Sequence, residues 1–182
     1  MVCGVGNNSG DGLAMARHIH RWGGLSAVSC VDVSRLRGAA ALERDALTKL
    51  GVDISGELRL EGAEVVVDAL FGTGLSRAPE GKFAAWIDAI NSSGAQVVAI
   101  DVPSGLDADT GVAYAPCVLA DTTVTLGLPK PGLLEGAGPT HAGDVWVVDI
   151  GVPFEAYAEV GVHVPRDLFA KSDRFHLSGS KT

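Results

Sequence analysis

The stretch Gly4-Val5-Gly6-Asn7-Asn8-Ser9-Gly10-Asp11-Gly12 decides the expected fold, because it places glycine, amide and carboxylate residues directly before a helical pattern. Glycine permits positive φ and lets a ligand approach bare backbone. Asn and Asp add side-chain oxygens, and the first amides of the following helix have no partners inside it. Such a stretch predicts an anion-binding loop, although clusters of Gly, Asn, Asp and Ser are also ordinary turn sequences.

Helical and strand patterns alternate on the carboxyl side of this loop. Apolar residues have helical spacing over 11–22, and Gly23-Gly24 ends the pattern. Strands that are apolar throughout and alternate with helices predict an α/β fold, with a mostly parallel sheet covered on both faces. Further helices are expected at 39–50 and 82–93, and strands at 27–33, 65–67, 97–100, 122–126 and 145–150.

The two ends of the chain differ from this regular middle part. Residues 1–3 look like the end of a strand, and a strand that enters such a loop normally has about five or six residues, so we expect a truncated first strand. After Pro153 the pattern decays. We therefore expect one domain over 1–153 and a C-terminal extension over 154–182, of which 171–182 form a mobile tail.

The composition of the chain argues against some classes of protein function. The chain has 182 residues, 47% of them hydrophobic, and a formal net charge of −8. The negative charge argues against a nucleic-acid-binding protein or one that binds an anionic membrane surface. Cys3, Cys30 and Cys117 form no CxxC pair, which favours reduced thiols in a cytoplasmic protein. No apolar run approaches the roughly 18 residues of a membrane span, and no signal peptide is recognisable.

Polar residues gather where the predicted strands end. Asn7 and Asn8 follow the first strand, Asp68 follows 65–67 and Asp101 follows 97–100. In a parallel sheet these ends lie at one edge, where ligands bind, although each Asp taken alone fits a cap or turn. Two neighbouring carboxylates suit proton transfer. The oxygens of Asn8, Asp68 and Ser104 suit a hard cation.

The dinucleotide fingerprint G-x-G-x-x-G is only partly present. Ser9 stands where the third glycine belongs, and Gly10 comes one position late. An acidic residue after the second strand is present as Asp32. An NAD(P)-dependent oxidoreductase therefore remains an alternative function.

Four ordered segments give the chain a more specific resemblance. It resembles the NAD(P)H-hydrate epimerase family, also called the YjeF N-terminal domain family. The segments are Val2-Cys3-Gly4-Val5-Gly6-Asn7-Asn8-Ser9-Gly10-Asp11-Gly12, Val67-Asp68-Ala69-Leu70-Phe71-Gly72-Thr73-Gly74-Leu75, Ala99-Ile100-Asp101-Val102-Pro103-Ser104-Gly105-Leu106-Asp107 and Gly143-Asp144-Val145-Trp146-Val147-Val148-Asp149-Ile150-Gly151.

The resemblance implies a Rossmann-like three-layer α/β/α sandwich with a bound potassium ion. It implies an isomerase that interconverts the S and R epimers of hydrated NADH or NADPH, a damage product of the cofactor. The functional partner would be an NAD(P)H-hydrate dehydratase that accepts one of the epimers. The function would thus be nicotinamide-nucleotide repair in the cytoplasm.

The resemblance also implies the site residues. Potassium would be held by Asn8, Asp68 and Ser104, and the proton-transfer group would be Asp101 or Asp68. The substrate would contact residues from three loops, namely Asn7, Asn8, Ser9, Gly10, Asp11, Gly72, Thr73, Gly74, Leu75, Ser76, Arg77, Ala78 and Asp101.

One departure from the family pattern is the missing segment before the glycine loop. Relatives usually have helices and the start of the first strand there, and a homodimer interface and some substrate contacts depend on them. A non-catalytic nucleotide-binding or scaffold module is therefore a further alternative.

Overall fold

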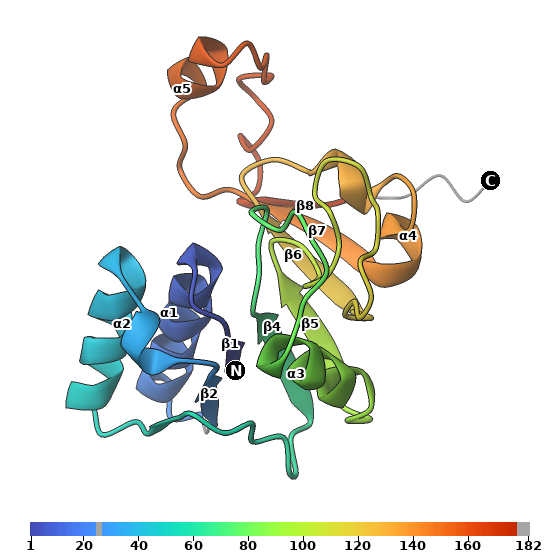
Figure 1. Ribbon diagram of the computed structural model, residues 1–182. Coiled ribbons are helices and arrows are strands. Elements are labelled where there is room, and N and C mark those ends of the chain that lie inside the picture. Colours follow the sequence, from blue (N-terminus) through green and yellow to red (C-terminus); the bar gives the residue numbers. More distant parts are fainter. Residues whose placement is uncertain (25–26, 178–182) are drawn as a thin grey trace.

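The computed structural model describes residues 1–24 and 27–177, and its centre is one sheet in the order β3-β2-β1-β4-β5-β6-β7-β8 (Figure 1). All neighbouring strands pair in parallel except β7 and β8, which are antiparallel. The expected mostly parallel sheet is confirmed. The strands are β1 Val2–Cys3, β2 Val28–Cys30, β3 Ile54–Ser55, β4 Val65–Ala69, β5 Gln96–Ile100, β6 Thr122–Leu126, β7 Asp144–Val148 and β8 Arg174–Leu177.

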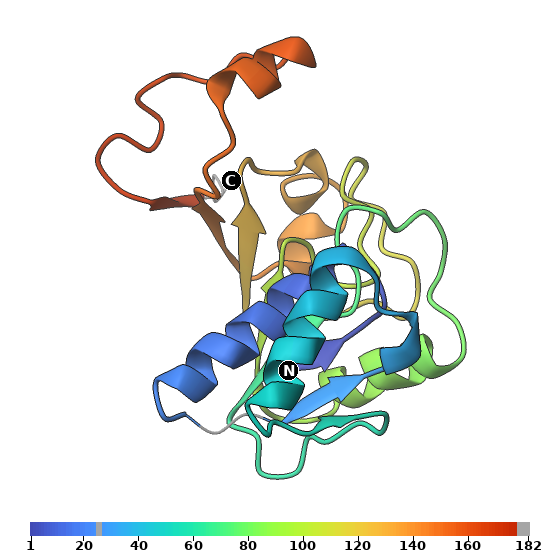
Figure 2. The same cartoon turned by 90° about the vertical axis from the view of Figure 1, so that its left-hand side faces the viewer.

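Helices cover the sheet in two outer layers. Helices α1 and α2 lie side by side on one face, and α3 covers the other (Figures 1 and 2). The three-layer α/β/α prediction is thereby confirmed. The helices are α1 Asn7–Arg21, α2 Gly38–Lys49, α3 Lys82–Asn91, α4 Gly138–His141 and α5 Phe154–Glu159, with 3-10 turns η1 Val33–Arg35 and η2 Pro131–Leu133.

The strands are apolar throughout because both faces are buried. Successive side chains of a strand point to opposite faces. Val67 and Ala69 pack with Leu13 of α1, whereas Val66 packs with Ile87 of α3. Both faces of the central strands thus belong to the core, which explains why their sequences show no polar alternation.

The first helix begins earlier than expected. We predicted a loop up to Asp11 and a helix over 11–22, but α1 begins at Asn7. Asn, Ser and Gly are weak helix formers, so local preference favours a loop there. Tertiary packing overrides it, because Ser9 and Gly10 are buried, and a Cβ on Gly10 would lie 3.3 Å from the Ala40 Cα of α2.

The tail prediction for residues 171–182 is wrong for the part that the structure describes. Residues Arg174–Leu177 form β8 and pair with β7, for example Phe175 with Val147. Residues 178–182 lie outside the described part. The segment between β7 and β8, which contains α5, projects away from the sheet in both views (Figures 1 and 2). The domain boundary at residue 153 stays a prediction.

Other predicted elements differ mainly at their ends. Strand β2 covers only Val28–Cys30 of the predicted 27–33, and Asp32 instead caps η1 by accepting a hydrogen bond from Ser34 N. Strand β7 stops at Val148, and α3 stops at Asn91. The structure adds the short β3, η2 and α4, whose two to four residues are too few for a periodic pattern.

The order of the strands defines where a ligand would bind. Chain order runs from β1 through β2 to β3 on one side and from β4 outward on the other. The reversal between β1 and β4 is a topological switch point, where open α/β sheets bind ligands outside the carboxyl ends of the strands. Within residues 1–24 and 27–177, no helix combines the length and apolar character needed to cross a membrane.

Candidate functional site

The loop from β1 to α1 lies directly against the end of β4. A Cβ on Gly4 would lie 2.1 Å from the Leu70 carbonyl oxygen, so only glycine fits there. Gly6 precedes α1, and no side chain among the described residues caps the helix. The Ser9 amide donates to Gly6 O, which leaves the amides of Asn7 and Asn8 for a ligand at the switch point.

Asn8, in the first turn of α1, joins three strand ends. Its Nδ2 donates hydrogen bonds to the carbonyls of Phe71, at 2.8 Å, and Ile100, at 3.2 Å. Phe71 follows β4, and Ile100 is the last residue of β5. One buried amide thus ties the β1–α1 connection to the two loops that follow.

Asp68 is a fully buried carboxylate within β4. It accepts hydrogen bonds from Leu70 N at 3.1 Å, Ser104 N at 2.8 Å and Ser104 Oγ at 2.7 Å. Burial raises the pKa of Asp68 to about 6, and these hydrogen bonds offset only part of that effect. At neutral pH the site therefore holds a buried negative charge.

Asn8 Oδ1 is the one buried side-chain oxygen or nitrogen without a hydrogen-bond partner among the described residues. A buried polar atom without a partner usually marks a missing ligand, ion or water. Its neighbour Phe71 also connects it to Ser104, because Phe71 N donates to Ser104 Oγ at 2.9 Å. Asn8 and Ser104 therefore both contact Phe71, and Ser104 also contacts Asp68.

The side-chain oxygens of Asn8, Asp68 and Ser104 fit a hard cation better than a transition metal. In residues 1–24 and 27–177, no group of three or more His, Cys, Asp or Glu residues could hold a metal ion. The three cysteines are free and buried, as expected for reduced thiols. The unpartnered amide oxygen and the buried carboxylate are the features that a bound cation would satisfy.

Asp101 is held in an unusual backbone conformation directly after β5. Its φ is 70°, and it is the one non-glycine residue in the described part with positive φ. Its amide donates to Val124 O at 2.8 Å, and its Oδ1 accepts from Leu126 N at 3.3 Å and Thr125 Oγ1 at 3.4 Å. Strain of this kind persists where the surroundings enforce it, commonly at functional sites.

The second carboxylate oxygen of Asp101 faces the loop after β4. Oδ2 accepts no hydrogen bond from the described residues and lies 3.3 Å from the place where a Cβ on Gly72 would be. The same Cβ would lie 3.4 Å from Asn8 Cβ. One oxygen of Asp101 is thus fixed by protein, and the other is available beside Asn8 and Gly72.

Two further charged groups border Asp101. The Lys130 Nζ is 2.5 Å from Asp101 Oδ1, and both side chains are largely buried, at 17% and 14% exposure. The side chain of Asp11 reaches solvent. Partial burial raises the pKa of Asp11, and the negative charge of Asp101 raises it further. Our sequence analysis missed Lys130, although a lysine just after the end of β6 at the same edge was a usable signal.

The structure brings some of the predicted substrate residues together and leaves others apart. Asn8, Gly72 and Asp101 meet, whereas Ser9 faces the core and donates to Ala69 O at 3.4 Å. Gly10 is buried against α2. Substrate contact by Asn7, Asp11 and the largely exposed residues 73–78 stays a prediction.

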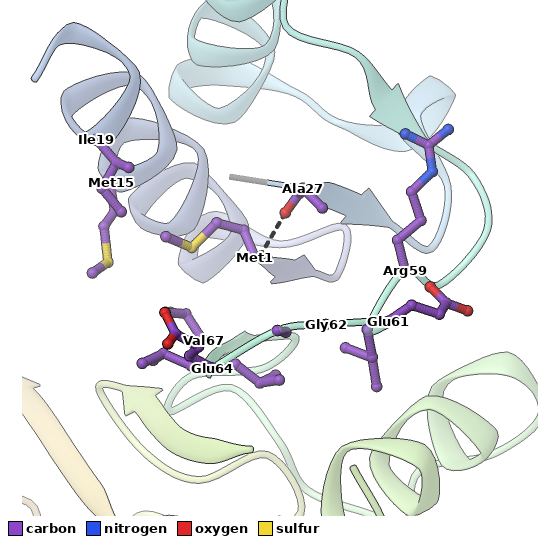
Figure 3. A pocket seen from close by; sticks show the side chains of 13 residues that line it. Met1, Met15, Ile19, Ala27, Arg59, Glu61, Gly62, Glu64 and Val67 are labelled. Atoms are coloured by element: carbon purple, nitrogen blue, oxygen red, sulfur yellow. Dashed lines mark hydrogen bonds between the residues drawn. The ribbon is translucent and has the colours of Figure 1, made fainter. Parts of the chain in front are cut away.

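A cavity lies at the opposite edge of the sheet, where the strands begin. Its volume is about 840 Å³, and Met15 and Ile19 of α1 lie across it from Val67 of β4 (Figure 3). The Met1 ammonium borders it and donates to Ala27 O at 2.8 Å. The carboxyl edge is the better candidate site, because the strained and buried polar groups converge there.

Comparison with known proteins adds an independent line of evidence. A family model described as "YjeF-related protein N-terminus" matches residues 1–132. The NAD(P)H-hydrate epimerase of Levilactobacillus brevis is 39% identical over 154 residues, covering 84% of this chain and 72% of that protein. The NAD(P)H-hydrate epimerase of Rhodopirellula baltica is 34% identical, covering 89% of this chain and 69% of that protein.

A longer relative and a solved structure are also similar to this chain. The Bifunctional NAD(P)H-hydrate repair enzyme Nnr of Thermofilum pendens is 43% identical over 84% of this chain, which spans only 31% of that protein. The crystal structure of yeast ynu0 has a TM-score of 0.78 and 24% identity, over 97% of this chain and 75% of the yeast chain. That structural match supports the fold.

Proposed function

The chain belongs to the family of YjeF-related protein N-termini, and from this membership we propose that it interconverts the S and R epimers of hydrated NADH and NADPH. The proposal rests on two features that lie together at the switch point. One is the strained Asp101, whose carboxylate is held through one oxygen, and the other is the uncapped start of α1. The first supplies a base and the second an anion-binding surface. Relatives named NAD(P)H-hydrate epimerase support the same reaction.

The chemistry follows from the substrate. Hydration of the enamine of a reduced nicotinamide places a hydroxyl group on the carbon beside the ring nitrogen. Asp101 Oδ2 would take the hydroxyl proton, the bond from this carbon to nitrogen would break to give an aldehyde, and Asp101 would pass the same proton to the released nitrogen. Reclosure on the other face of the aldehyde, with the two proton transfers reversed, yields the other epimer.

The remaining residues would bind and orient the substrate. The amides of Asn7 and Asn8 at the start of α1 would hold phosphate groups, which a chain of net charge −8 must bind locally. The exposed loop 72–78 would close over the nicotinamide beside Gly72. Asp68 is buried beneath this surface, so we assign proton transfer to Asp101.

We also propose a potassium ion held by Asn8, Asp68 and Ser104. The support is the unpartnered Asn8 Oδ1, the fully buried Asp68 carboxylate, and Ser104, which contacts Asp68 and shares the neighbour Phe71 with Asn8. The ion would supply positive charge next to the bound substrate and compensate Asp68. Asn8 and Ser104 would meanwhile keep the loops after β4 and β5 in place.

Three further assignments from the sequence stay proposals. An NAD(P)H-hydrate dehydratase would consume one epimer, consistent with the name of the bifunctional relatives. The protein would work in the cytoplasm, where the reduced cofactor pool is used. A homodimer stays a prediction that light scattering in solution would test.

The experiment is chromatographic separation of the two epimers of hydrated NADPH over time. One purified epimer is incubated with and without the protein, in potassium and in sodium buffer. We expect faster equilibration with protein, and more acceleration in potassium. Equal rates with and without a folded protein would contradict the proposal, and net consumption of NADPH with a reducible substrate would favour an oxidoreductase.

A further inference from the structure

The connection after β6 places one lysine ammonium against the carboxylate of Asp101. Lys130 Nζ lies 2.5 Å from Asp101 Oδ1 and donates to Leu126 O at 2.7 Å. The side chain therefore folds back over the end of its own strand. Two oxygen partners at short distance fix the position of the ammonium group.

The backbone of this connection leaves Lys130 little freedom. Gly127 has a φ of 76°, and its amide donates to Val148 O, so the chain turns sharply at the end of β6. Leu128 N then donates to Leu126 O, and Pro131 starts η2 directly after Lys130. With 17% of its side chain exposed, this lysine differs from an ordinary mobile surface lysine.

The Lys130 ammonium group also balances negative charge next to Asp101. Asp11 and Asp101 are close enough for the charge of Asp101 to raise the pKa of Asp11. Lys130 is the one cationic side chain that pairs with either carboxylate among the described residues. Without it, two neighbouring negative charges would face an anionic substrate.

The two carboxylate oxygens of Asp101 have different surroundings. Lys130, Thr125 and the Leu126 amide all contact Oδ1. Oδ2 is left facing Gly72. A carboxylate anchored through one oxygen presents the other in a single orientation.

We propose that Lys130 is a positioning residue for the epimerisation, which anchors Asp101 through Oδ1 so that Oδ2 accepts the substrate proton. This inference rests on the proposed function. It assigns a role to a residue outside both the predicted substrate-binding set and the predicted cation-binding set. Lys130 itself contacts the carboxylate and not the reacting carbon.

The test compares Lys130→Met and Lys130→Arg with the wild-type protein in the epimer assay, at several substrate concentrations. Lys130→Met should lower kcat about 100-fold, the loss that a misplaced group can cause, with KM changed less than about threefold. Lys130→Arg keeps a cation and should recover about a tenth or more of the wild-type kcat. Lys49→Met is the matched control, because Lys49 is exposed at the end of α2, and it should leave kcat unchanged.

A double-mutant cycle separates positioning from general structural support. If Lys130 acts through Asp101, Lys130→Met should cause no further loss in the Asp101→Asn background. Equal losses in both backgrounds, a raised KM with wild-type kcat, or wild-type activity of Lys130→Met would overturn the role of Lys130. A wild-type protein that does not accelerate equilibration would instead refute the proposed function, before any variant is measured.

Protein NMR provides a readout that does not depend on activity. The side-chain ammonium signal of Lys130, assigned by its loss in Lys130→Arg, should be protected from exchange because it is buried and paired. It should shift and exchange faster in Asp101→Asn, while the Lys49 signal stays unchanged. An unprotected Lys130 signal in the folded wild-type protein would overturn the pairing itself.

Discussion

Asp101 shows how a single residue is forced into place by its surroundings. A positive φ at a non-glycine residue costs on the order of 1–3 kcal/mol. Hydrogen bonds from the Asp101 amide to Val124 and from Leu126 to its carboxylate maintain this conformation at the start of the loop. Because of this turn, the side chain leaves the line of β5 and lies at the carboxyl edge of the sheet.

The space beside Asp101 is small enough to test with one methyl group. Gly72→Ala would place a Cβ 3.3 Å from Asp101 Oδ2, so the carboxylate must shift by a few tenths of an ångström. We expect kcat for epimerisation to fall about tenfold, since catalysis depends steeply on such distances. The time course of epimer equilibration measures the effect.

Gly56→Ala is the control for this substitution. A Cβ on Gly56 meets no atom within 4 Å, and Gly56 lies outside the site. Its kcat should equal that of the wild-type protein. Full activity of Gly72→Ala would show that Oδ2 does not need its present position.

The sequence predicted the main polar residues of the site but not their full surroundings. Asn8, Asp68, Asp101 and Ser104 were predictable because each lies near the end of an apolar strand or on the loop that follows it. Lys130 was not predicted: its position after β6 indicates the same edge of the sheet, but its contact with Asp101 depends on how residues 126–131 turn back. The unpartnered Asn8 oxygen is likewise visible only in three dimensions.

At the scale of elements, α1 is the part that sequence patterns described least well. Asn8, Ser9 and Gly10 are polar or small yet buried, because Asn8 hydrogen-bonds to two neighbouring loops and glycine allows close packing. A polar segment that is satisfied inside the protein looks like a loop in the sequence. The apolar strand β5, by contrast, was predicted to within one residue, whereas β4 extends two residues beyond the predicted 65–67 and contains Asp68.

Close packing of α1 on the sheet predicts an effect on stability. A Cβ at Gly12 would lie 2.6 Å from Ala69 Cβ and 3.1 Å from Cys3 Sγ. Gly12→Ala should therefore lower the free energy of unfolding by about 1–2 kcal/mol, as overpacking does, despite the better helix propensity of alanine. Urea denaturation measures this change, and a more stable variant would contradict the packing.

The buried carboxylate that links β4 to the loop after β5 predicts a pH dependence. Burial raises the pKa of Asp68 from 3.8 to about 6, so the folded protein holds this proton to higher pH than the unfolded chain does. The stability that this group contributes is present below about pH 4 and is lost as the pH rises through about 6. Above pH 6 the charged carboxylate is available to a cation.

Potassium should therefore stabilise the protein more at pH 8 than at pH 5. The measurement is the Tm in potassium and in sodium buffer of equal ionic strength at both pH values. Asn8→Ala removes the unpartnered oxygen and should abolish the difference between the two ions. A potassium effect of equal size at both pH values would argue against Asp68 as a ligand.

At the scale of the whole molecule, the sheet separates two edges with different properties. The polar, strained groups gather where the strands end, and the cavity of Figure 3 lies where they begin. Parallel pairing explains the first feature, because it brings the carboxyl ends of β1, β4 and β5 to one side. The sequence predicted that the strands run parallel, and therefore which edge of the sheet carries the polar groups. The cavity could not be predicted, because it depends on the packing of α1.

The C-terminal strand contributes to the sheet but lies far from the switch point. Within the described residues, β8 pairs with β7 alone and covers its edge. A chain that ends at Asp173 should have a Tm lower by about 4 °C, equivalent to about 1–2 kcal/mol for a protein of this size. Its epimerisation kcat should be unchanged. The control is a chain that ends at Leu177. A large loss of kcat on removal of β8 would contradict a purely structural role for this strand.

The most direct test of the central claim is the rate of epimer equilibration in Asp101→Asn, measured by chromatography in potassium buffer beside the wild-type protein. Asparagine keeps the shape of the side chain but cannot take up the substrate proton. We expect a loss of about 100-fold or more in kcat, typical of a missing general base, with an unchanged Tm to within a few degrees. Wild-type kcat in a folded Asp101→Asn variant would contradict the assignment of this edge of the sheet as the catalytic site.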